Sequence, residues 1–300
     1  MQLRGVFIDD TFAEAFTVRV ARVIITARSP RWAREAALKL TGFATSVIGC
    51  KCEAGVETEL QPSETPDGRP GISVLVMTMA KDELATRLVE RIGQTVLTCP
   101  STACYDGLPE APDRIGVGST LRFFGDGFQA SKVIRGERFW RIPVMEGEFL
   151  VQEKFGMQKA VGGGNFLILA RSADAALDAA EAAVAAMTPA VGVILPFPGG
   201  VVRSGSKVGS RRSKKMIAST NDAFCPTLKG AVKSELDADT IAVLEIVIDG
   251  LTSKSVADAM RAGLKAVIET GAAKGVTRVS AGNYGGNLGQ HHYHLKDLLP

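Results

Sequence analysis

Residues 23–37 read VIITARSPRWAREAA, and residues 166–180 read FLILARSADAALDAA. Each segment begins with an apolar run that predicts a strand, continues with Ala-Arg-Ser, and ends in an alanine-rich stretch that predicts a helix. Ser29 and Ser172 occupy the position expected of a helix N-cap, and Pro30 suits the first helical position. The chain therefore contains an internal repeat of a strand followed by a helix.

A second pair of segments repeats the same order. Residues 72–96 run from the apolar ISVLVMTM into a helical pattern with apolar residues four positions apart. Residues 241–281 run from IAVLEIVI into a longer helical pattern and then into a strand-like segment. The apolar runs near 43–50 and 191–197 follow the first helix of each half and predict the strands in between.

Each half therefore reads strand-helix-strand, connection, strand-helix-strand, which is the order of the split β-α-β, ferredoxin-like unit. We predict an α+β fold of two ferredoxin-like lobes related by internal duplication, with the lobes at 1–149 and 150–300. The connections at 98–165 and 196–240 hold most of the Gly, Pro and aromatic residues. We expect ordered loops there, which build the site and the subunit contacts.

The composition is that of a globular protein, with 46% hydrophobic residues, 22% charged residues and a net charge of +3. This balance does not by itself indicate a nucleic-acid or membrane partner. The five cysteines are odd in number and scattered, which favours a reduced, cytoplasmic setting over a disulfide scaffold. The histidines of HHYHL, at 291–295, indicate a polar C-terminal strand rather than a metal cluster.

The stretch IAVLEIVIDG, residues 241–250, places Glu245 in the middle of an apolar run. On a strand, Val243, Glu245 and Val247 face one way, and both faces are apolar enough to be covered. Burial raises the pKa of a carboxyl group, which is what a general acid or base near neutral pH needs. A buried ion pair with an arginine or lysine from a loop is the structural alternative.

A glycine-rich and basic stretch, PFPGGVVRSGSKVGSRRSKK, spans residues 196–215. Its glycines leave backbone N–H groups free to meet an anion. Its positive charge comes from Arg203, Lys207, Arg211, Arg212, Lys214 and Lys215. The stretch predicts a site for an anionic ligand or partner, with a solvated basic loop as the alternative. STNDAFCP at 219–226 is a turn pattern whose polar side chains, if they converge, suit a polar heterocycle.

Motifs along almost the whole chain, from residue 5 to residue 298, are similar to those of one family. They are DDTFAEAF at 9–16, TGFATSVIGC at 41–50, ETPDGRPG at 64–71, RIGQTVLTCP at 91–100, FFGDGF at 123–128, PFPGGVV at 196–202, SKVGS at 206–210, ASTNDAFCPT at 218–227, LEIVIDGL at 244–251 and SAGNYGGNLGQ at 280–290. Together they resemble the formylmethanofuran:tetrahydromethanopterin formyltransferases.

The resemblance implies transfer of a formyl group between the amine of methanofuran and N5 of tetrahydromethanopterin, without a metal or prosthetic group. It also implies two ferredoxin-like lobes assembled into homodimers and tetramers, with the coenzymes in clefts at the lobe and subunit contacts. The glutamate of the EIVI-GL motif is the acid/base group of the family, and Glu245 takes that position here. A carboxyl group of elevated pKa, shielded from water, suits this transfer.

The resemblance also implies roles for other side chains, by motif position. Asn221 and backbone N–H groups around Ser206 and Gly209 are expected to stabilise the oxyanion of the tetrahedral adduct. The anionic tails of the two coenzymes are expected to meet the positive charge of the basic stretch. The expected substrate-binding residues are Arg203, Ser206, Lys207, Gly209, Ser210, Arg211 and Asp222.

The segment RRSKKMI after SKVGS is more basic than is typical of archaeal members. The chain therefore resembles the bacterial, methylotroph-type members, which are similar to subunits of a formyltransferase/hydrolase complex with an amidohydrolase-like partner. Two other classes stay open, namely a non-catalytic scaffold in such a complex and an anion- or RNA-binding ferredoxin-like module. The predicted strands VARVIITA, ISVLVM and IAVLEIVI contain no aromatic residue on which an RNA base could stack, which argues against RNA binding.

Overall fold

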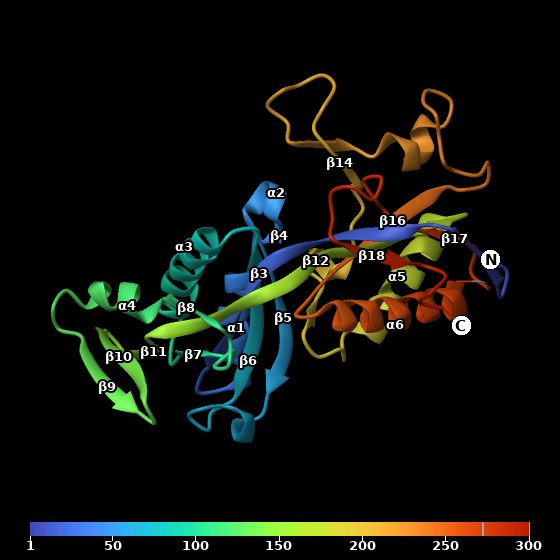
Figure 1. Ribbon diagram of the computed structural model, residues 1–300. Coiled ribbons are helices and arrows are strands. Elements are labelled where there is room, and N and C mark those ends of the chain that lie inside the picture. The colour runs from blue at the N-terminus through green and yellow to red at the C-terminus, as the bar shows by residue number, and fades with distance from the viewer. Residues whose placement is uncertain (272, 300) are drawn as a thin grey trace. The chain divides into compact units, whose positions relative to one another are not determined.

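The computed structural model describes residues 1–271 and 273–299 (Figure 1). Strands and helices follow one another along the chain, so the predicted mixture of the two is confirmed. The chain forms two compact units, one of Met1–Thr17 with Val161–Pro300 and one of Val18–Ala160. They are termed the 161–300 unit and the 18–160 unit.

The division between the units falls inside two long strands, β3 (Phe12–Thr26) and β12 (Lys154–Ala170). The first residues of β3 belong to the 161–300 unit, and the first residues of β12 belong to the 18–160 unit. The N-terminal segment thus folds with the C-terminal half of the chain. The compact units therefore differ in composition from the lobes at 1–149 and 150–300, and that division stays a prediction.

The 18–160 unit is built around four antiparallel strands in the order β7-β3-β6-β5, with β5 at Cys52–Leu60, β6 at Gly71–Thr78 and β7 at Ala103–Asp106. Helices α1 (Pro30–Thr41) and α3 (Lys81–Arg91) pack on this sheet through one apolar core. Every residue of β6 is buried, which explains why its sequence is an almost unbroken apolar run.

The remaining elements of this unit are short and include a hairpin region. They are β4 (Thr45–Ser46), α2 (Val47–Cys50), η1 (Pro62–Glu64), η2 (Ile92–Val96), β8 (Asp113–Gly116), α4 (Gly118–Leu121), η3 (Arg122–Gly125), β9 (Ala130–Ile134), β10 (Glu137–Val144) and β11 (Gly147–Gln152). The loop predicted at 98–165 is therefore wrong, because β7 to β12 occupy much of it. Trp140, Ile142 and Phe149 join the core from paired strands, and this burial holds the hairpin in the sheet.

The strand predicted near 43–50 is also wrong. Ser46 begins the short helix α2 by accepting a hydrogen bond from the backbone N–H of Ile48 at 3.3 Å, and Lys51 ends it in a left-handed conformation. The strand follows as β5, whose sequence CEAGVETEL is more polar than the predicted run. Its antiparallel pairing with β6 outweighs that weak local preference.

The 161–300 unit has the same strand order. Its antiparallel order is β17-β12-β16-β13, with β13 at Val193–Ile194, β16 at Ala242–Gly250 and β17 at Val276–Ser280. Helix α5 (Ala173–Met187) follows β12, and helix α6 (Ser253–Gly271) follows β16. In each unit, the strand that comes last among these four, β7 or β17, thus pairs with the outer edge of the first, β3 or β12.

The 161–300 unit also contains short strands and turns of helix around this sheet. They are β1 (Gln2–Leu3), β2 (Val6–Ile8), η4 (Pro198–Gly200), β14 (Ser206–Val208), β15 (Ala218–Thr220), η5 (Asp222–Phe224), η6 (Pro226–Leu228) and β18 (His291–His294). β2 pairs with β17, and β18 pairs with the first residues of β3. The predicted C-terminal strand around the histidines is therefore confirmed as β18.

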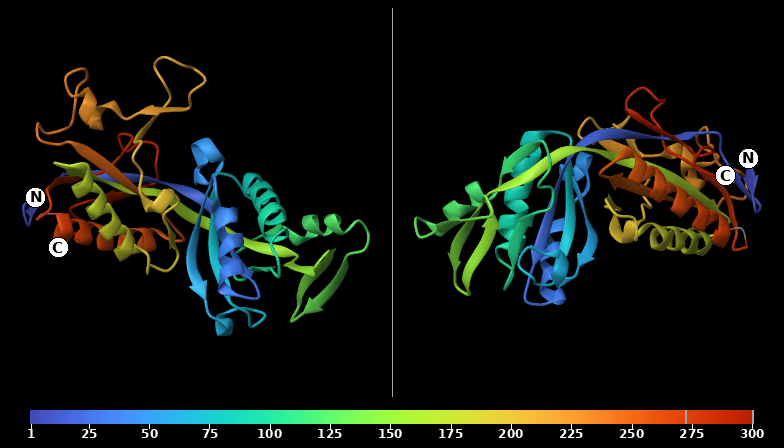
Figure 2. Two further views of the ribbon diagram at one scale, coloured as in Figure 1. Left: turned by 180° about the vertical axis from the view of Figure 1, so that it is seen from behind. Right: turned by 60° about the horizontal axis from the view of Figure 1, so that its bottom comes forward.

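Helices α5 and α6 lie side by side on one face of the sheet of the 161–300 unit (Figure 2). The predicted N-cap of α5 is confirmed, because the Ser172 hydroxyl oxygen accepts a hydrogen bond from the Ala175 N–H at 3.1 Å. Small residues let the helices approach: a Cβ on Gly263 would lie 2.8 Å from the Met187 sulfur. Along the described chain, no helix is both long and apolar enough to cross a membrane.

Ala179→Leu is expected to destabilise the protein, because Ala179 is fully buried on the packed side of α5. Over-packing costs about 1–3 kcal/mol of the free energy of unfolding. Leu177→Ala is the matched control, since Leu177 is 45% exposed on the same helix, and its effect should stay within about 0.5 kcal/mol. Urea unfolding followed by circular dichroism compares the two, and equal unfolding midpoints contradict this packing of α5.

Candidate active site

The sheet of the 161–300 unit has one face covered by helices and one face that is less covered. On β16, Ile246 and Ile248 are fully buried in the core formed with α5 and α6. Val243, Glu245 and Val247 point to the opposite face and are partly exposed. The expectation that both faces of this strand are covered is therefore confirmed on the helix side only.

Glu245 lies in the middle of this more open face. On β12 its register partner is Leu167, and the partner of Leu167 on β17 is Ser280. On the other side of β16, the Val202 N–H donates to the Glu245 carbonyl at 2.7 Å, and the Glu245 N–H donates to the Val202 carbonyl at 2.9 Å. The backbone is thus held from both sides, and this fixes the direction in which the Glu245 side chain points.

The carboxylate of Glu245 forms no hydrogen bond or ion pair with another residue of the described chain. Burial raises the pKa of Glu245 from 4.5 to about 7. The buried ion pair considered as the structural alternative is therefore not formed among residues 1–271 and 273–299. A carboxyl group with a pKa near neutrality can accept a proton in one step and return it in the next.

The segment after Val202 brings Asn221 toward Glu245. Three residues on, Gly205 lies against Asn221, whose Cβ is 3.4 Å from the position of a Cβ added to Gly205. Asn221 therefore lies on the segment that borders β16 beside Glu245, although three extended residues allow Gly205 itself to lie about 10 Å from Val202. Its side-chain amide makes no hydrogen bond within the described part of the chain, so it is available as a donor.

Lys207 and Asp222 form an ion pair in the same region. The Lys207 ammonium lies 2.5 Å from one oxygen of Asp222, and the Arg211 guanidinium lies 3.9 Å from the other. The hydrogen bond from Lys207 is the main cause that lowers the pKa of Asp222. The charge of Lys207 is therefore offset, whereas Arg203 is exposed and pairs with no residue that the structure describes.

The other predicted site residues lie on or beside the β14-β15 hairpin. Ser206 begins β14, and the Gly209 N–H donates to the Ile217 carbonyl at 2.8 Å. In this conformation the Gly209 N–H is not available to an oxyanion. The Ser210 hydroxyl oxygen accepts from two backbone N–H groups of the turn that follows. Among the predicted oxyanion donors, Asn221 therefore keeps an uncommitted amide.

The sequence analysis missed a second glutamate in an apolar strand. Glu14, on β3, is 1% exposed and accepts hydrogen bonds from four backbone N–H groups of the loop 282–289. Burial acts to raise its pKa, but these donors outweigh burial and lower it to about 2. The signal was present, since FAEAF also places one carboxylate among apolar residues.

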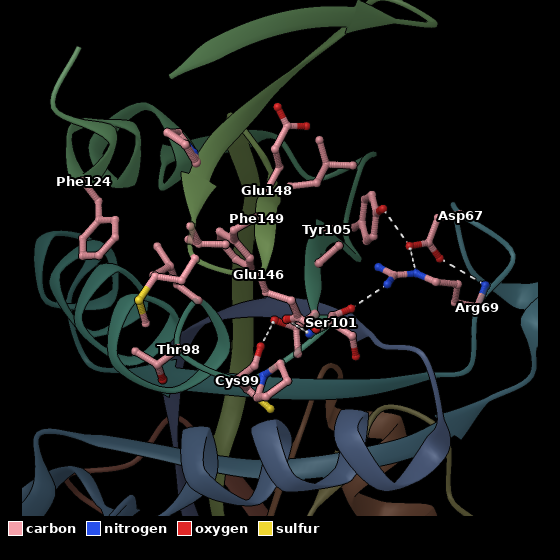
Figure 3. Close-up of a pocket in the computed structure, with 18 residues that line it drawn as sticks. Asp67, Arg69, Thr98, Cys99, Ser101, Tyr105, Phe124, Glu146, Glu148 and Phe149 are labelled. Carbon is pink, nitrogen blue, oxygen red and sulfur yellow. Dashed lines mark hydrogen bonds and ion pairs between the residues drawn. The ribbon is translucent and has the colours of Figure 1, made fainter. Parts of the chain in front are cut away.

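A cavity of about 1080 Å³ lies in the 18–160 unit, and none of the predicted site residues lines it (Figure 3). Its charged groups are bonded to one another. Arg69 contacts the Asp67 carboxylate at 2.8 Å and donates to the Ser101 carbonyl at 2.6 Å. Glu146 accepts from the Ser101 N–H at 2.6 Å. Because Asp67 and Arg69 are paired with each other and Glu146 is held by a backbone N–H, the cavity suits proton transfer less well than the face of Glu245.

The cysteines and histidines serve local contacts. Within residues 1–271 and 273–299, no group of three or more side chains is placed to hold a metal ion. All five cysteines are free thiols. A ring nitrogen of His291 lies 3.1 Å from the Thr17 hydroxyl, and the Phe12 ring packs against the rings of His292 and His294.

A carboxyl group whose pKa lies near neutrality is typical of enzymes that use general acid–base catalysis. Comparison with family models gives the particular family. The model described as formylmethanofuran-tetrahydromethanopterin formyltransferase matches residues 1–144, and the model described as its proximal lobe matches residues 147–298. The chain belongs to the formylmethanofuran-tetrahydromethanopterin formyltransferase family, which confirms the resemblance seen in the motifs.

Relatives and solved structures agree over the full length. The formylmethanofuran–tetrahydromethanopterin formyltransferase of Methylobacillus flagellatus is 59% identical, and the match covers 100% of both chains. The formyltransferase structure from Methanosarcina barkeri has a TM-score of 0.92 at 49% identity, covering 99% of this chain and 100% of that one. A chain of the formyltransferase/hydrolase complex of Methylorubrum extorquens, solved with methylofuran, has a TM-score of 0.96 at 53% identity, covering 100% of this chain and 99% of that one.

Glu245→Gln is expected to raise the free energy of unfolding at pH 8. The pKa of this carboxyl group is about 7 in the folded protein, whereas an unperturbed glutamate, as in the unfolded chain, has a pKa of 4.5. The wild-type protein therefore loses stability as the pH rises from 4.5 to 7. Glutamine removes that loss, which amounts to about 1–3 kcal/mol at pH 8 and almost nothing at pH 4.

Urea unfolding at pH 4 and pH 8 measures this difference. Glu269→Gln is the control, because Glu269 is exposed on α6. If Glu245→Gln and wild-type protein show the same pH dependence of stability, the raised pKa is wrong.

Proposed function

We propose that this chain is a formyltransferase of one-carbon metabolism, which moves a formyl group between the amine of methanofuran and N5 of tetrahydromethanopterin. The observation that carries the proposal is Glu245, whose pKa is near 7 and whose carboxylate is unpaired within the described chain. Membership of the family indicates the two coenzymes, which act here as substrates. The proposed reaction uses no prosthetic group.

In the proposed reaction the attacking nitrogen forms a bond to the formyl carbon, and the carbonyl electron pair moves onto oxygen. The Glu245 carboxylate takes the proton that this nitrogen loses. When the tetrahedral adduct collapses, the bond from carbon to the leaving nitrogen breaks and Glu245 returns the proton to that nitrogen. One carboxyl group thus serves as base and then as acid, and the reverse transfer uses the same steps.

Side chains near Glu245 support this chemistry in the proposal. The uncommitted amide of Asn221 donates to the oxyanion of the adduct. The exposed guanidinium of Arg203 attracts the anionic tails of the coenzymes. Further contacts to these substrates are assigned to Ser206, Lys207, Gly209, Ser210, Arg211 and Asp222. Because Lys207 is paired with Asp222, Arg203 is more available than Lys207 to bind an anionic group of a substrate.

Residues 1–149 and 150–300 are proposed to be ferredoxin-like lobes that arose by internal duplication, and each contains the sheet of one of the two units. Supporting this, both have two strand-helix-strand segments and the same antiparallel strand order. The repeated Ala-Arg-Ser segments stand at the same place in each, between the first strand and the first helix. The family models divide between 144 and 147, close to the division at 149–150 that we propose for the lobes.

The chain is proposed to work as a homo-oligomer in the cytoplasm, together with hydrolase-type subunits. The support is the relative from Methylorubrum extorquens, which is one of the subunits of a formyltransferase/hydrolase complex. The partly exposed face around Glu245 is consistent with cover from another copy of the chain, from a hydrolase-type partner or from substrate. A nucleic-acid or membrane partner is not part of the proposal.

Glu245→Gln is expected to lower kcat/KM for formyl transfer by about 10²–10⁴-fold, because the proton carrier is lost. In the wild-type protein kcat/KM should rise between pH 6 and pH 8, since the carboxylate form grows as the pH passes the pKa of about 7. The variant should lose this rise. Steady-state transfer assays with both coenzymes measure it, with Glu269→Gln as control, and full activity in Glu245→Gln excludes the proposed role.

Arg203→Gln is expected to raise KM for the anionic coenzymes about three- to tenfold, which corresponds to the loss of roughly one charge-assisted contact. The effect should shrink at high salt, because exposed charges are screened. Lys265→Gln is the control, since Lys265 is exposed on α6, on the other side of the sheet. A KM that does not change, at low and at high salt, contradicts this assignment.

A further inference from the structure

Glu14 holds the loop 282–289 with both of its carboxylate oxygens. One oxygen accepts two N–H groups at 2.6 and 2.9 Å, and the other accepts two at 2.7 and 2.6 Å. The donors are the backbone N–H groups of Tyr284, Gly286, Leu288 and Gly289. The loop contains no helix or strand, so this buried carboxylate takes the place of a regular hydrogen-bond ladder.

The glycines of this loop are required by the way it wraps around Glu14. A Cβ on Gly289 would lie 2.5 Å from the Ala15 carbonyl oxygen, which no side chain permits. Gly285 and Gly286 have φ values of +84° and +76°, a conformation that favours glycine. The sequence GNYGGNLG is therefore fitted to one buried carboxylate, and DDTFAEAF supplies that carboxylate.

Asn165 ties the start of the loop to the face that carries Glu245. Its side-chain oxygen accepts from the Gly282 N–H at 2.6 Å, and its side-chain nitrogen donates to the Gly282 carbonyl at 3.1 Å. Asn165 is in register with Val247, which follows Glu245 on the same face of β16. Asn165 and Glu245 are therefore diagonal neighbours, with Cβ atoms about 7–8 Å apart.

The loop 282–289 lies on the side of the sheet opposite to α5 and α6, as does the segment that contains β14 (Figure 1). The turned views of Figure 2 agree. The loop comes after β17 in the chain. Residues 202–222 begin at Val202, which pairs with β16 at the edge that faces away from β12. The face of Glu245 is thus bordered by a loop on each side, one neutral and one basic.

We propose that Glu14 is a positioning residue for formyl transfer, which holds the loop 282–289 as the wall that seats the pterin ring of tetrahydromethanopterin beside Glu245. This inference rests on the proposed function of Glu245. The neutral loop suits the ring because its glycines present bare peptide groups that a flat heterocycle with polar edges approaches closely. The basic segment on the other border suits the glutamate tail of methanofuran.

Glu14→Gln tests this positioning role, because an amide cannot accept four N–H groups and brings donors of its own into the loop. We expect the Kd of tetrahydromethanopterin, measured by calorimetric titration, to rise about tenfold, with a similar rise in KM and kcat within about threefold of wild type. The Kd of methanofuran should not change. Amide hydrogen exchange should become faster in residues 283–289.

Asp106→Asn is the matched control. Asp106 is also a buried carboxylate that accepts two backbone N–H groups, at 2.9 Å each, and it pairs in addition with Arg114 at 2.7 Å, but it lies in the 18–160 unit. This variant loses the same kind of bond together with an ion pair, so it perturbs stability at least as much, and it should still bind both coenzymes normally. If it weakens pterin binding as much as Glu14→Gln does, the effect is general loss of stability and the positioning role is wrong. Gly289→Ala, which pushes the loop off Glu14, replaces Glu14→Gln if that variant does not fold.

The outcomes separate this inference from the proposed function. If Glu14→Gln binds tetrahydromethanopterin normally although its loop exchanges faster, the positioning role is wrong, whatever Glu245 does. If only methanofuran binding is weakened, the assignment of the pterin to this loop is wrong. If pterin binding is weakened but Glu245→Gln keeps full activity, the loop inference stands and the acid/base role of Glu245 fails.

Discussion

The removal of one carboxylate from water, without a cation to compensate it, is the constraint on which this site depends. Both edges of β16 are hydrogen-bonded at Glu245, so the backbone conformation is fixed there. The side chain therefore stays on the face of the sheet opposite to α5 and α6. The raised pKa of Glu245 lowers the free energy of unfolding at neutral and higher pH. The close packing of α5 and α6 on the other face of the sheet makes that cost tolerable.

Two glutamates in apolar strands illustrate how surroundings decide the chemistry of one residue type. Glu14 is the more buried of the two, yet its pKa is lowered because four N–H groups stabilise the charge. Glu245 has no such donors within the described chain, and its pKa is raised by burial. The first is therefore a permanent anion that organises a loop, and the second is able to change its protonation near pH 7.

Local signals in the sequence predicted the parts of the structure that local chemistry determines. The strand-helix repeats follow from apolar periodicity, and Glu245 stood out as a lone carboxylate in an apolar run. The strand β5 and the hairpin around Trp140 were missed, because their sequences are polar in places and pairing with neighbouring strands, rather than local preference, stabilises them. The partners of Glu14 were missed because they lie at least 270 residues further along the chain.

The shared strands β3 and β12 have a consequence for how the chain is made. Residues 12–15 are synthesised well before their partner strand at 291–294. The 18–160 unit can fold while translation continues, whereas the unit that holds Glu245 cannot complete its sheet until residue 294 has been made. Until then the edge of residues 12–15 lacks this partner strand, which makes it a binding site for a chaperone.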